Sequence, residues 1–317
     1  MSGLPLTAGA AVLVVGGANV DLKAQSTAAM VPATSNPGTT VLSPGGVGRN
    51  IAENAARLGA RVQLASIVGD DALGEDLLSA TAAAGVDVRL VQRGSVPTGT
   101  YTALLDRSGD LVAAVAAMAV IEELEVAPIV DAIERSAPDT VVVLDGNLPP
   151  DTLSALLVAC ETAALRVVLD PVSVPKAERL APVLGPPLFL LTPNRDELAA
   201  LTALPVETAA ELTAAAEALR SRAVEWVWVR LGSEGSTLVG PGVTTILSPY
   251  GVDVIDVTGA GDAMLGAFCQ ALAGGADVLA AARFGQAAAA LTVASEQTVR
   301  PDLTPALIKE LLDAEDH

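Results

Sequence analysis

The segment Asp256-Val-Thr-Gly-Ala-Gly-Asp262 is followed at once by an apolar stretch, residues 263–272, that predicts a helix. The three small residues at 259–261 let the backbone turn tightly and approach a ligand closely. They end where a helix begins, and the unpaired N–H groups and the dipole of a helix start favour an anion. A carboxylate at this spot, Asp262, is unfavourable beside an anion unless it accepts a proton from an attacking hydroxyl. The simpler alternative is a glycine-rich turn in which the aspartate only caps the helix.

Outside this segment, short runs of β-branched residues alternate with longer Ala- and Leu-rich amphipathic stretches. The short runs predict strands at 12–16, 62–68, 141–144, 167–169, 188–191 and 224–231. The amphipathic stretches predict helices at 50–58, 76–84, 150–162, 208–220, 262–272, 279–293 and 305–314. This alternation predicts an α/β fold with a mostly parallel sheet and helices on both faces, in which ligands bind at the carboxyl ends of the strands.

Two stretches interrupt the alternation. Residues 19–43 contain two prolines and show no helical period, and residues 98–118 predict a hairpin around Ser108-Gly109. We expect these two excursions to pair as a small sheet that covers a site, although ordinary surface insertions are an alternative. No internal repeat or linker is found, so a single domain over 1–317 is expected, with loose ends at 1–10 and 314–317.

The composition narrows the possible partners. The chain has 317 residues, of which 51% are hydrophobic and only 2% aromatic, so the core must consist of Ala, Val and Leu. A formal charge of −19 repels phosphate backbones, which argues against nucleic-acid binding. The N-terminal stretch lacks the basic region of a signal peptide, and no apolar run reaches the roughly 18 residues of a membrane span. We therefore expect a soluble cytoplasmic protein without membrane or nucleic-acid partners.

Missing residue types exclude several mechanisms. The two cysteines are too few for a disulfide framework or a Cys-rich zinc site. The only histidine is His317, which excludes histidine-based triads and histidine-ligated metals. None of the three lysines follows a glycine, so there is no Walker A loop. Catalysis must then depend on carboxylates, backbone amides and bound cations.

Two further segments place polar groups at the start of a predicted helix. In residues 43–59, Gly45, Gly46 and Gly48 precede a helix with Asn50 in its first turn, so a polar ligand could lie on the backbone. In residues 192–197, Asn194 and Glu197 face alike on a starting helical turn, and a carboxylate there suits water-mediated Mg²⁺. Each segment by itself is equally compatible with a plain loop-to-helix turn.

Two other segments follow predicted strands. Residues 230–235 form a glycine turn, which is a weak signal alone. Residues 16–21, Gly-Gly-Ala-Asn-Val-Asp, provide polar Asn19 and Asp21 but lack the G-x-G-x-x-G spacing of a dinucleotide site.

Taken in order, GGANVD, PGGVGRNIAENAARLG, TPNRDE, RLGSEG and DVTGAGD resemble the motifs of ribokinase-like (phosphofructokinase-B) sugar and nucleoside kinases over nearly the whole chain. The resemblance implies a three-layer α/β sandwich with a small β-sheet lid, whose strands would come from 19–43 and 98–118. It implies transfer of the γ-phosphate of ATP to a sugar or nucleoside hydroxyl, with Mg²⁺ and K⁺ as cofactors. Exposed strand edges on such a lid further predict a homodimer formed through it.

The resemblance also implies roles for individual residues. The catalytic set is Asp262 as general base, with the amides of Gly259, Ala260 and Gly261 as anion hole. The substrate-binding set is Asn19, Asp21, Gly45, Gly46, Asn50 and Asp145. The nucleotide-binding set is Asn194, Arg230, Gly232, Gly235, Gly261 and Gln286. The metal set is Glu197 for Mg²⁺, with Asp256, Thr258 and Ser295 for a monovalent cation.

Within this family, SNPG at 35–38 and SPGGVGRNIAEN at 43–54 resemble the pseudouridine kinases, including Arg49 in place of a smaller residue. The implied product is pseudouridine 5′-phosphate. Residues 113–119, AAVAAMA, are nearly devoid of polar side chains where base or sugar contacts are expected, so a ribokinase or another nucleoside kinase stays open. A non-catalytic nucleoside-binding protein is disfavoured by the intact DVTGAGD segment, and a nicotinamide dehydrogenase by the missing glycine spacing.

Overall fold

The computed structural model describes residues 11–315 of the chain. Of the expected loose ends, residues 1–10 and 316–317 lie outside the described residues. The expectation is wrong for residues 314 and 315, because both belong to the last helix.

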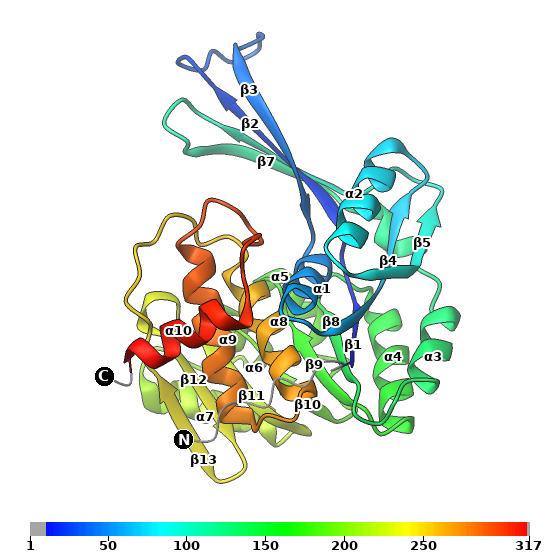
Figure 1. Ribbon diagram of the computed structural model, residues 1–317, viewed down its shortest axis with the longest axis vertical. Helices are drawn as coiled ribbons and strands as arrows, with labels where there is room; N and C mark the ends of the chain where they lie inside the picture. Colours follow the sequence, from blue (N-terminus) through cyan, green and yellow to red (C-terminus); the bar gives the residue numbers. More distant parts are fainter. Residues whose placement is uncertain (1–10, 316–317) are drawn as a thin grey trace.

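The main sheet has nine strands, each labelled in Figure 1. They are β1 (Ala11–Val15), β4 (Arg61–Gly69), β5 (Asp87–Gly94), β8 (Val141–Asp145), β9 (Arg166–Asp170), β10 (Leu188–Leu191), β11 (Val224–Arg230), β12 (Ser236–Gly240) and β13 (Val243–Leu247). Their order is β13-β12-β11-β10-β9-β8-β1-β4-β5, and only β12 and β13 run antiparallel to their neighbours. From β1 the chain builds the sheet outward in both directions, so the strand order reverses at β1. Open α/β sheets bind their ligands at such a reversal, beyond the carboxyl ends of the strands.

Helices cover both faces of the main sheet, as the sequence predicts. They are α1 (Val47–Arg57), α2 (Ala72–Ala83), α3 (Ala127–Glu134), α4 (Pro150–Thr162), α5 (Val174–Leu180), α6 (Arg195–Thr202), α7 (Ala209–Arg220), α8 (Ala260–Ala273), α9 (Val278–Val293) and α10 (Pro305–Glu315), with short 3₁₀ turns η1 (Ala119–Glu123) and η2 (Gly232–Glu234). Leu13 and Val15 of β1 pack with α3 to α7. Val12 and Val14 point the other way and pack with α1, α8, α9 and α10. Alternate residues of one buried strand therefore join two hydrophobic layers, which gives the expected three-layer sandwich.

The four remaining strands form a small sheet that projects from the body (Figure 1). They are β2 (Asn19–Ser26), β3 (Gly38–Gly45), β6 (Thr100–Leu105) and β7 (Leu111–Ala117), in the order β3-β2-β6-β7. The two excursions do pair, because β2 runs parallel to β6 from Val20 opposite Thr100 to Gln25 opposite Leu105. The hairpin around Ser108-Gly109 is also present, between β6 and β7. Every residue of β7 is exposed, although the strand consists of Leu, Val and Ala.

The sequence analysis missed several elements. The edge strand β5 contains Arg89 and Arg93 and is only half-buried, so it shows no continuous apolar run. Helices α3 and α5 have eight and seven residues, too few for a clear helical period. The β12–β13 hairpin could have been found from Pro241-Gly242, which separates two apolar runs.

The core is built mainly of Ala, Val and Leu, as the composition requires. Trp228, Phe268 and Phe284 are its large aromatic exceptions, and the ring centroids of Trp228 and Phe268 lie 5.5 Å apart. Between residues 11 and 315, no helix combines the length and the apolar character needed to cross a membrane.

Candidate active site

Polar side chains collect at the carboxyl ends of the parallel strands. Asp145 and Asp170 are the last residues of β8 and β9 and lie opposite each other in the sheet. Arg230 is the last residue of β11, and Asn194, just beyond β10, forms an isolated bridge with it. Because parallel strands end at one edge of a sheet, residues distant in sequence become neighbours here.

The DVTGAGD segment forms the start of α8, as predicted. Gly259 is the N-cap residue and adopts a left-handed conformation with φ 80°. A Cβ at this position would overlap the carbonyl oxygen of Thr298, so only glycine fits. The helix then begins with Ala260 and Gly261, whose N–H groups have no acceptor within the helix, although the Ala260 N–H donates to the Val257 carbonyl at 3.4 Å. This N-terminus can hold an anion.

Close packing of α1 on α8 brings Asn50 to Asp262. A Cβ on Gly266 of α8 would lie 2.8 Å from the Asn54 side chain and from the Ile51 carbonyl oxygen, so the two helices touch through backbone. Asn50 and Asp262 both lie in the first turn of their helices. The Asn50 Nδ2 group donates to Asp262 Oδ2 at 2.8 Å, across 212 residues of sequence.

The surroundings of Asp262 favour a proton on its carboxyl. Burial, with smaller contributions from the carboxylates of Asp170 and Asp145, raises its pKa to about 8, while the Asn50 hydrogen bond and Arg230 act in the opposite direction. A carboxyl with a pKa near neutral pH can accept and return a proton during turnover.

Arg230 connects three parts of the site. Its Nη1 lies 3.2 Å from Asp170 Oδ2, and its Nη2 lies 3.0 Å from Glu197 Oε2. The guanidinium also occupies the space that a Cβ of Gly261 would fill, so it lies directly against the start of α8. Its Nε is buried and has no hydrogen-bond partner among residues 11–315. Burial lowers the pKa of Arg230, but Asp170 and Glu197 outweigh burial and leave it raised, so Arg230 places a permanent positive charge beside the anion site.

Asn194 and Glu197 lie at the start of α6, where the sequence predicts a helical turn, and they form a capping box there. Asn194 Oδ1 accepts from the Glu197 backbone N–H at 2.8 Å, and Glu197 Oε2 accepts from the Asn194 N–H at 2.8 Å. This capping box fixes a buried Glu197 at the edge of the sheet. Burial raises the pKa of Glu197, and Arg230 counteracts it.

A second polar group lies where the small sheet joins the body. Asn19 Nδ2 donates to Asp21 Oδ1 at 2.7 Å, both on β2. The Asp21 carboxylate lies within 3 Å of the position that a Cβ of Gly45 would take, and Gly46 has φ 96° and touches the backbone of Gly17. Burial raises the pKa of Asp21, although Asn19 and nearby cations oppose it.

Asp145 is fully buried beside Gly16, Gly17 and Gly48. Its Oδ2 accepts from the Gly17 N–H at 2.9 Å and its Oδ1 from the Asn147 N–H at 2.8 Å. Burial raises its pKa, opposed by these bonds and by the nearby Lys176. Both oxygens of the Asp145 carboxylate therefore accept hydrogen bonds from backbone N–H groups, and the bond from Gly17 holds the loop after β1 in place.

The candidate cation ligands lie together at the other side of the α8 start. Asp256 Oδ1 accepts from the Thr258 N–H and hydroxyl at 2.9 and 2.7 Å, and the Asp256 N–H donates to the Val293 carbonyl at 3.2 Å. Ser295 follows two residues later, and its hydroxyl accepts from the Gln297 N–H at 3.2 Å. Lys23 of the small sheet lies 3.7 Å from Asp256 Oδ2.

The remaining nucleotide candidates belong to the β11–β12 turn and to α9. Gly232 and Gly235 have φ values of 58° and 87°, which the tight turn requires. Gln286 is buried, and its amide accepts from the Ser236 hydroxyl and donates to the Ser248 carbonyl. Both ends of the Gln286 amide are therefore bonded to other parts of the protein. Its role in nucleotide binding stays a prediction.

Sequence reasoning missed Asp170, Lys176 and the contacts of Arg49. Asp170 ends a predicted strand in the same way as Asp145, and that signal could have identified it. Lys176 bonds the Asn147 side chain, and nothing in its local sequence points to the site. Arg49 is buried beside Asn50 and donates to its side-chain oxygen at 2.9 Å.

Comparisons with known proteins agree with this geometry. Residues 10–305 match the model of the pfkB family of carbohydrate kinases. The chain is 31% identical over 307 residues to a pseudouridine kinase of Escherichia coli (strain K12), covering 95% of this chain and 96% of that protein.

Solved structures share the fold. A carbohydrate kinase from Agrobacterium tumefaciens has a TM-score of 0.82 at 32% identity, covering 95% of this chain and 96% of that one. The Arabidopsis thaliana ribokinase complexed with ribose and ATP has a TM-score of 0.83 at 25% identity, covering 96% of this chain and 99% of that one. The chain is a phosphotransferase that acts on a hydroxyl group, and it belongs to the pfkB family of carbohydrate kinases.

Proposed function

We propose that this kinase phosphorylates pseudouridine at its 5′-hydroxyl, with ATP as donor and Asp262 as general base. The observation that carries the proposal is the Asp262 carboxyl at the N-terminus of α8, bonded by Asn50 at 2.8 Å. A proton acceptor and an anion site lie side by side there, as a hydroxyl that attacks a phosphate requires. The likeness to a pseudouridine kinase over 95% of the chain supports this acceptor.

In the proposed reaction, the 5′-hydroxyl gives its proton to the Asp262 carboxylate as its oxygen attacks the γ-phosphorus. The bond between the γ-phosphorus and the bridging oxygen then breaks, and ADP leaves with that electron pair. The backbone N–H groups of residues 259–261 and the Arg230 guanidinium would face the charge that develops on the phosphoryl oxygens. The position of the N–H groups at the start of α8, and of Arg230 against Gly261, supports this assignment.

Mg²⁺ would neutralise the phosphates of the nucleotide. Within residues 11–315, no cluster of three or more His, Cys, Asp or Glu residues could hold a metal ion. Mg²⁺ needs only one or two protein carboxylates when phosphates and waters complete its shell. Glu197, fixed by its capping box at the sheet edge, is the carboxylate we assign to this role.

The nucleoside that accepts the phosphate would be held by the polar side chains where the small sheet joins the body. Asn19, Asp21 and Asn50 present amide and carboxylate groups that match ribose hydroxyls. A site whose buried polar groups match a hydroxyl rejects analogues that lack it, because those groups then stay unpaired. We therefore expect 2′-deoxynucleosides to lose about 10²-fold or more in kcat/KM.

The test is ATP consumption by the wild-type protein and Asp262→Asn, measured with pseudouridine, uridine, 2′-deoxyuridine and ribose. We expect the highest kcat/KM for pseudouridine and a loss of about 10²–10⁴-fold in kcat for Asp262→Asn, with the fold and ATP binding kept. A clear preference for ribose would make the protein a ribokinase. Wild-type turnover by a folded Asp262→Asn protein would remove the assigned base.

We also propose a K⁺ site formed by Asp256 and Thr258, with Ser295 nearby. Asp256 and the carbonyl of Val293 lie next to the start of α8, so a cation there would add positive potential beside the anion site. Activity should be several-fold higher in K⁺ than in Na⁺ at matched ionic strength and saturating Mg²⁺. Equal rates in the two salts would contradict the site.

Finally, we propose that the small sheet is a lid over the acceptor and that two lids pair in a homodimer. Lys23 of β2 already reaches Asp256 beside α8, which links the sheet to the site. The exposed side chains Leu111, Val112 and Val115 make β7 an apolar edge, and pairing with a second copy would cover it. Closure of the lid would exclude water and limit ATP hydrolysis.

A further inference from the structure

Arg49 is a buried cation in the first turn of α1, next to Asn50. Its side chain is almost fully enclosed, with 4% of the residue exposed. Nη1 donates to Asn50 Oδ1 at 2.9 Å, Nε donates to Thr81 Oγ1 at 3.3 Å, and Nη2 pairs with Glu53. A buried guanidinium held on three sides has one available orientation.

The contact with Asn50 determines which end of the amide meets Asp262. An amide side chain has an oxygen that accepts and a nitrogen that donates. Because Arg49 occupies the oxygen, the nitrogen points to Asp262 Oδ2 at 2.8 Å. A flipped amide would present its oxygen instead, which repels a carboxylate and favours the protonated carboxyl.

We infer that Arg49 is a positioning residue that fixes the amide of Asn50 so that it donates to the Asp262 carboxylate. The inference rests on the proposed role of Asp262 as base. It concerns which protonation state of Asp262 the folded protein supports, and it needs no contact between Arg49 and substrate.

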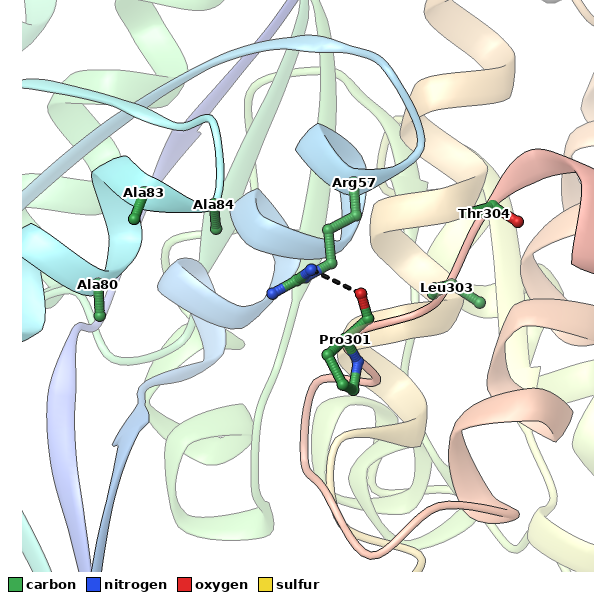
Figure 2. A pocket seen from close by; sticks show the side chains of 7 residues that line it. All are labelled: Arg57, Ala80, Ala83, Ala84, Pro301, Leu303 and Thr304. Atoms are coloured by element: carbon green, nitrogen blue, oxygen red, sulfur yellow. Dashed lines mark hydrogen bonds between the residues drawn. The ribbon is translucent and has the colours of Figure 1, made fainter.

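The rest of the network holds Arg49 in place. Glu53 Oε1 accepts from Arg57 Nε and Nη2 at 2.8 and 2.6 Å, so two arginines share one buried carboxylate. Arg57 Nη1 in turn donates to the Pro301 carbonyl at 2.7 Å, beside a surface pocket of about 420 Å³ (Figure 2). The network therefore runs from Asp262 through α1 to the segment that precedes α10.

The charges around Asp262 determine in which direction the loss of Arg49 would change the pKa of Asp262. The charged groups that act on Asp262 come from four elements and are Arg49 of α1, Asp145 of β8, Asp170 of β9 and Arg230 of β11. Burial, and then repulsion from Arg57, lowers the pKa of Arg49 to about 10, so Arg49 stays positive between pH 6 and 9. Without the Arg49 charge, repulsion from the carboxylates of Asp170 and Asp145 would be less compensated, and the pKa of Asp262 would rise.

Three variants test the inference. Arg49→Met removes the cation. The double variant R49M/E53Q removes it without leaving the Glu53 carboxylate buried opposite an apolar side chain, which protects the fold. Thr81→Val is the matched control, because it deletes a different partner of Arg49 and leaves the Asn50 contact.

Two measurements report on Asp262 directly. One is the acid limb of kcat/KM against pH, and the other is the ¹³C shift of the Asp262 carboxyl against pH in ligand-free protein, assigned by comparison with Asp262→Asn. In Arg49→Met and in the double variant, we expect the Asp262 carboxyl to titrate about one pH unit higher than in the wild type. At pH values on the acid limb, kcat/KM should then be about tenfold lower than in the wild type, and at higher pH the difference should be much smaller. Thr81→Val should follow the wild type.

An unchanged Asp262 titration in both Arg49 variants would overturn the inference, even if their turnover were slower at every pH. A shift of equal size in Thr81→Val would overturn it too, since general loosening of α1 would then explain the change. An active Asp262→Asn protein would instead contradict the proposed function, and the carboxyl titration would still decide whether Arg49 controls Asp262.

Discussion

At the scale of single residues, the site depends on one carboxyl whose surroundings hold its pKa far from the usual value. Burial is the main cause, and Asp170 and Asp145 add to it, so Asp262 has a pKa of about 8. Asn50 and Arg230 oppose this shift without cancelling it. At pH 7 the neutral carboxyl is therefore the favoured form.

This raised pKa predicts how activity depends on pH. The base must be ionised to accept a proton, and its ionised fraction increases as the pH rises towards about 8. We expect kcat/KM to increase about tenfold per pH unit below that value and to level off above it. The residual rate of Asp262→Asn should lack this limb. A flat profile between pH 6 and 9 for the wild type would contradict the assignment.

At the scale of elements, a loop and a helix start form the anion site. The left-handed residue Gly259 turns the chain into α8, and the Thr298 backbone lies against it where a Cβ would be. Gly266 allows α8 to touch α1, which brings Asn50 within bonding distance of Asp262. The geometry of the site is therefore set by how closely these backbones approach each other.

Gly259→Ala should damage both stability and catalysis. A left-handed alanine costs about 1–2 kcal/mol, and the overlap with Thr298 adds to this and shifts the N–H groups. Loss of one such donor typically lowers kcat by about 10²-fold or more. Gly275→Ala is the matched control, because Gly275 has φ 92° but no atom within 4 Å of its Cβ position. If thermal unfolding and kcat were equal in the two variants, the contact with Thr298 would have no role.

At the scale of the whole molecule, one sheet carries two hydrophobic layers and a projecting small sheet. Both hydrophobic clusters pack on the strands of the same main sheet, and for this reason we propose that the chain is a single domain. The small sheet is different, because β7 and part of β3 leave Val, Leu and Ala side chains exposed. Apolar strand edges of this kind are usually covered by a partner.

The proposed dimer predicts the effect of a charge on β7. Val115 is 66% exposed in the single chain, and Val115→Asp would place a carboxylate in the paired lids. We expect the dimer to weaken about 100-fold or more, with little change in monomer stability. Light scattering over a concentration series measures this. Val158→Asp on α4 is the control, since Val158 is 51% exposed and distant from the small sheet. A wild-type monomer at working concentration would refute the pairing.

The sequence by itself determined the α/β class, the two-sided helical layers and the residues of the glycine-rich helix start, because these depend on local backbone preferences and on periodicity. It also indicated Asp262, Asn50, Glu197 and Arg230 through their motifs. Only the tertiary structure decided that Asp170 lies against Arg230, and that Arg49 orients the Asn50 amide towards Asp262. Those contacts join residues up to 212 positions apart, and they follow from strand order and from the close packing of α1 on α8, which no local pattern encodes.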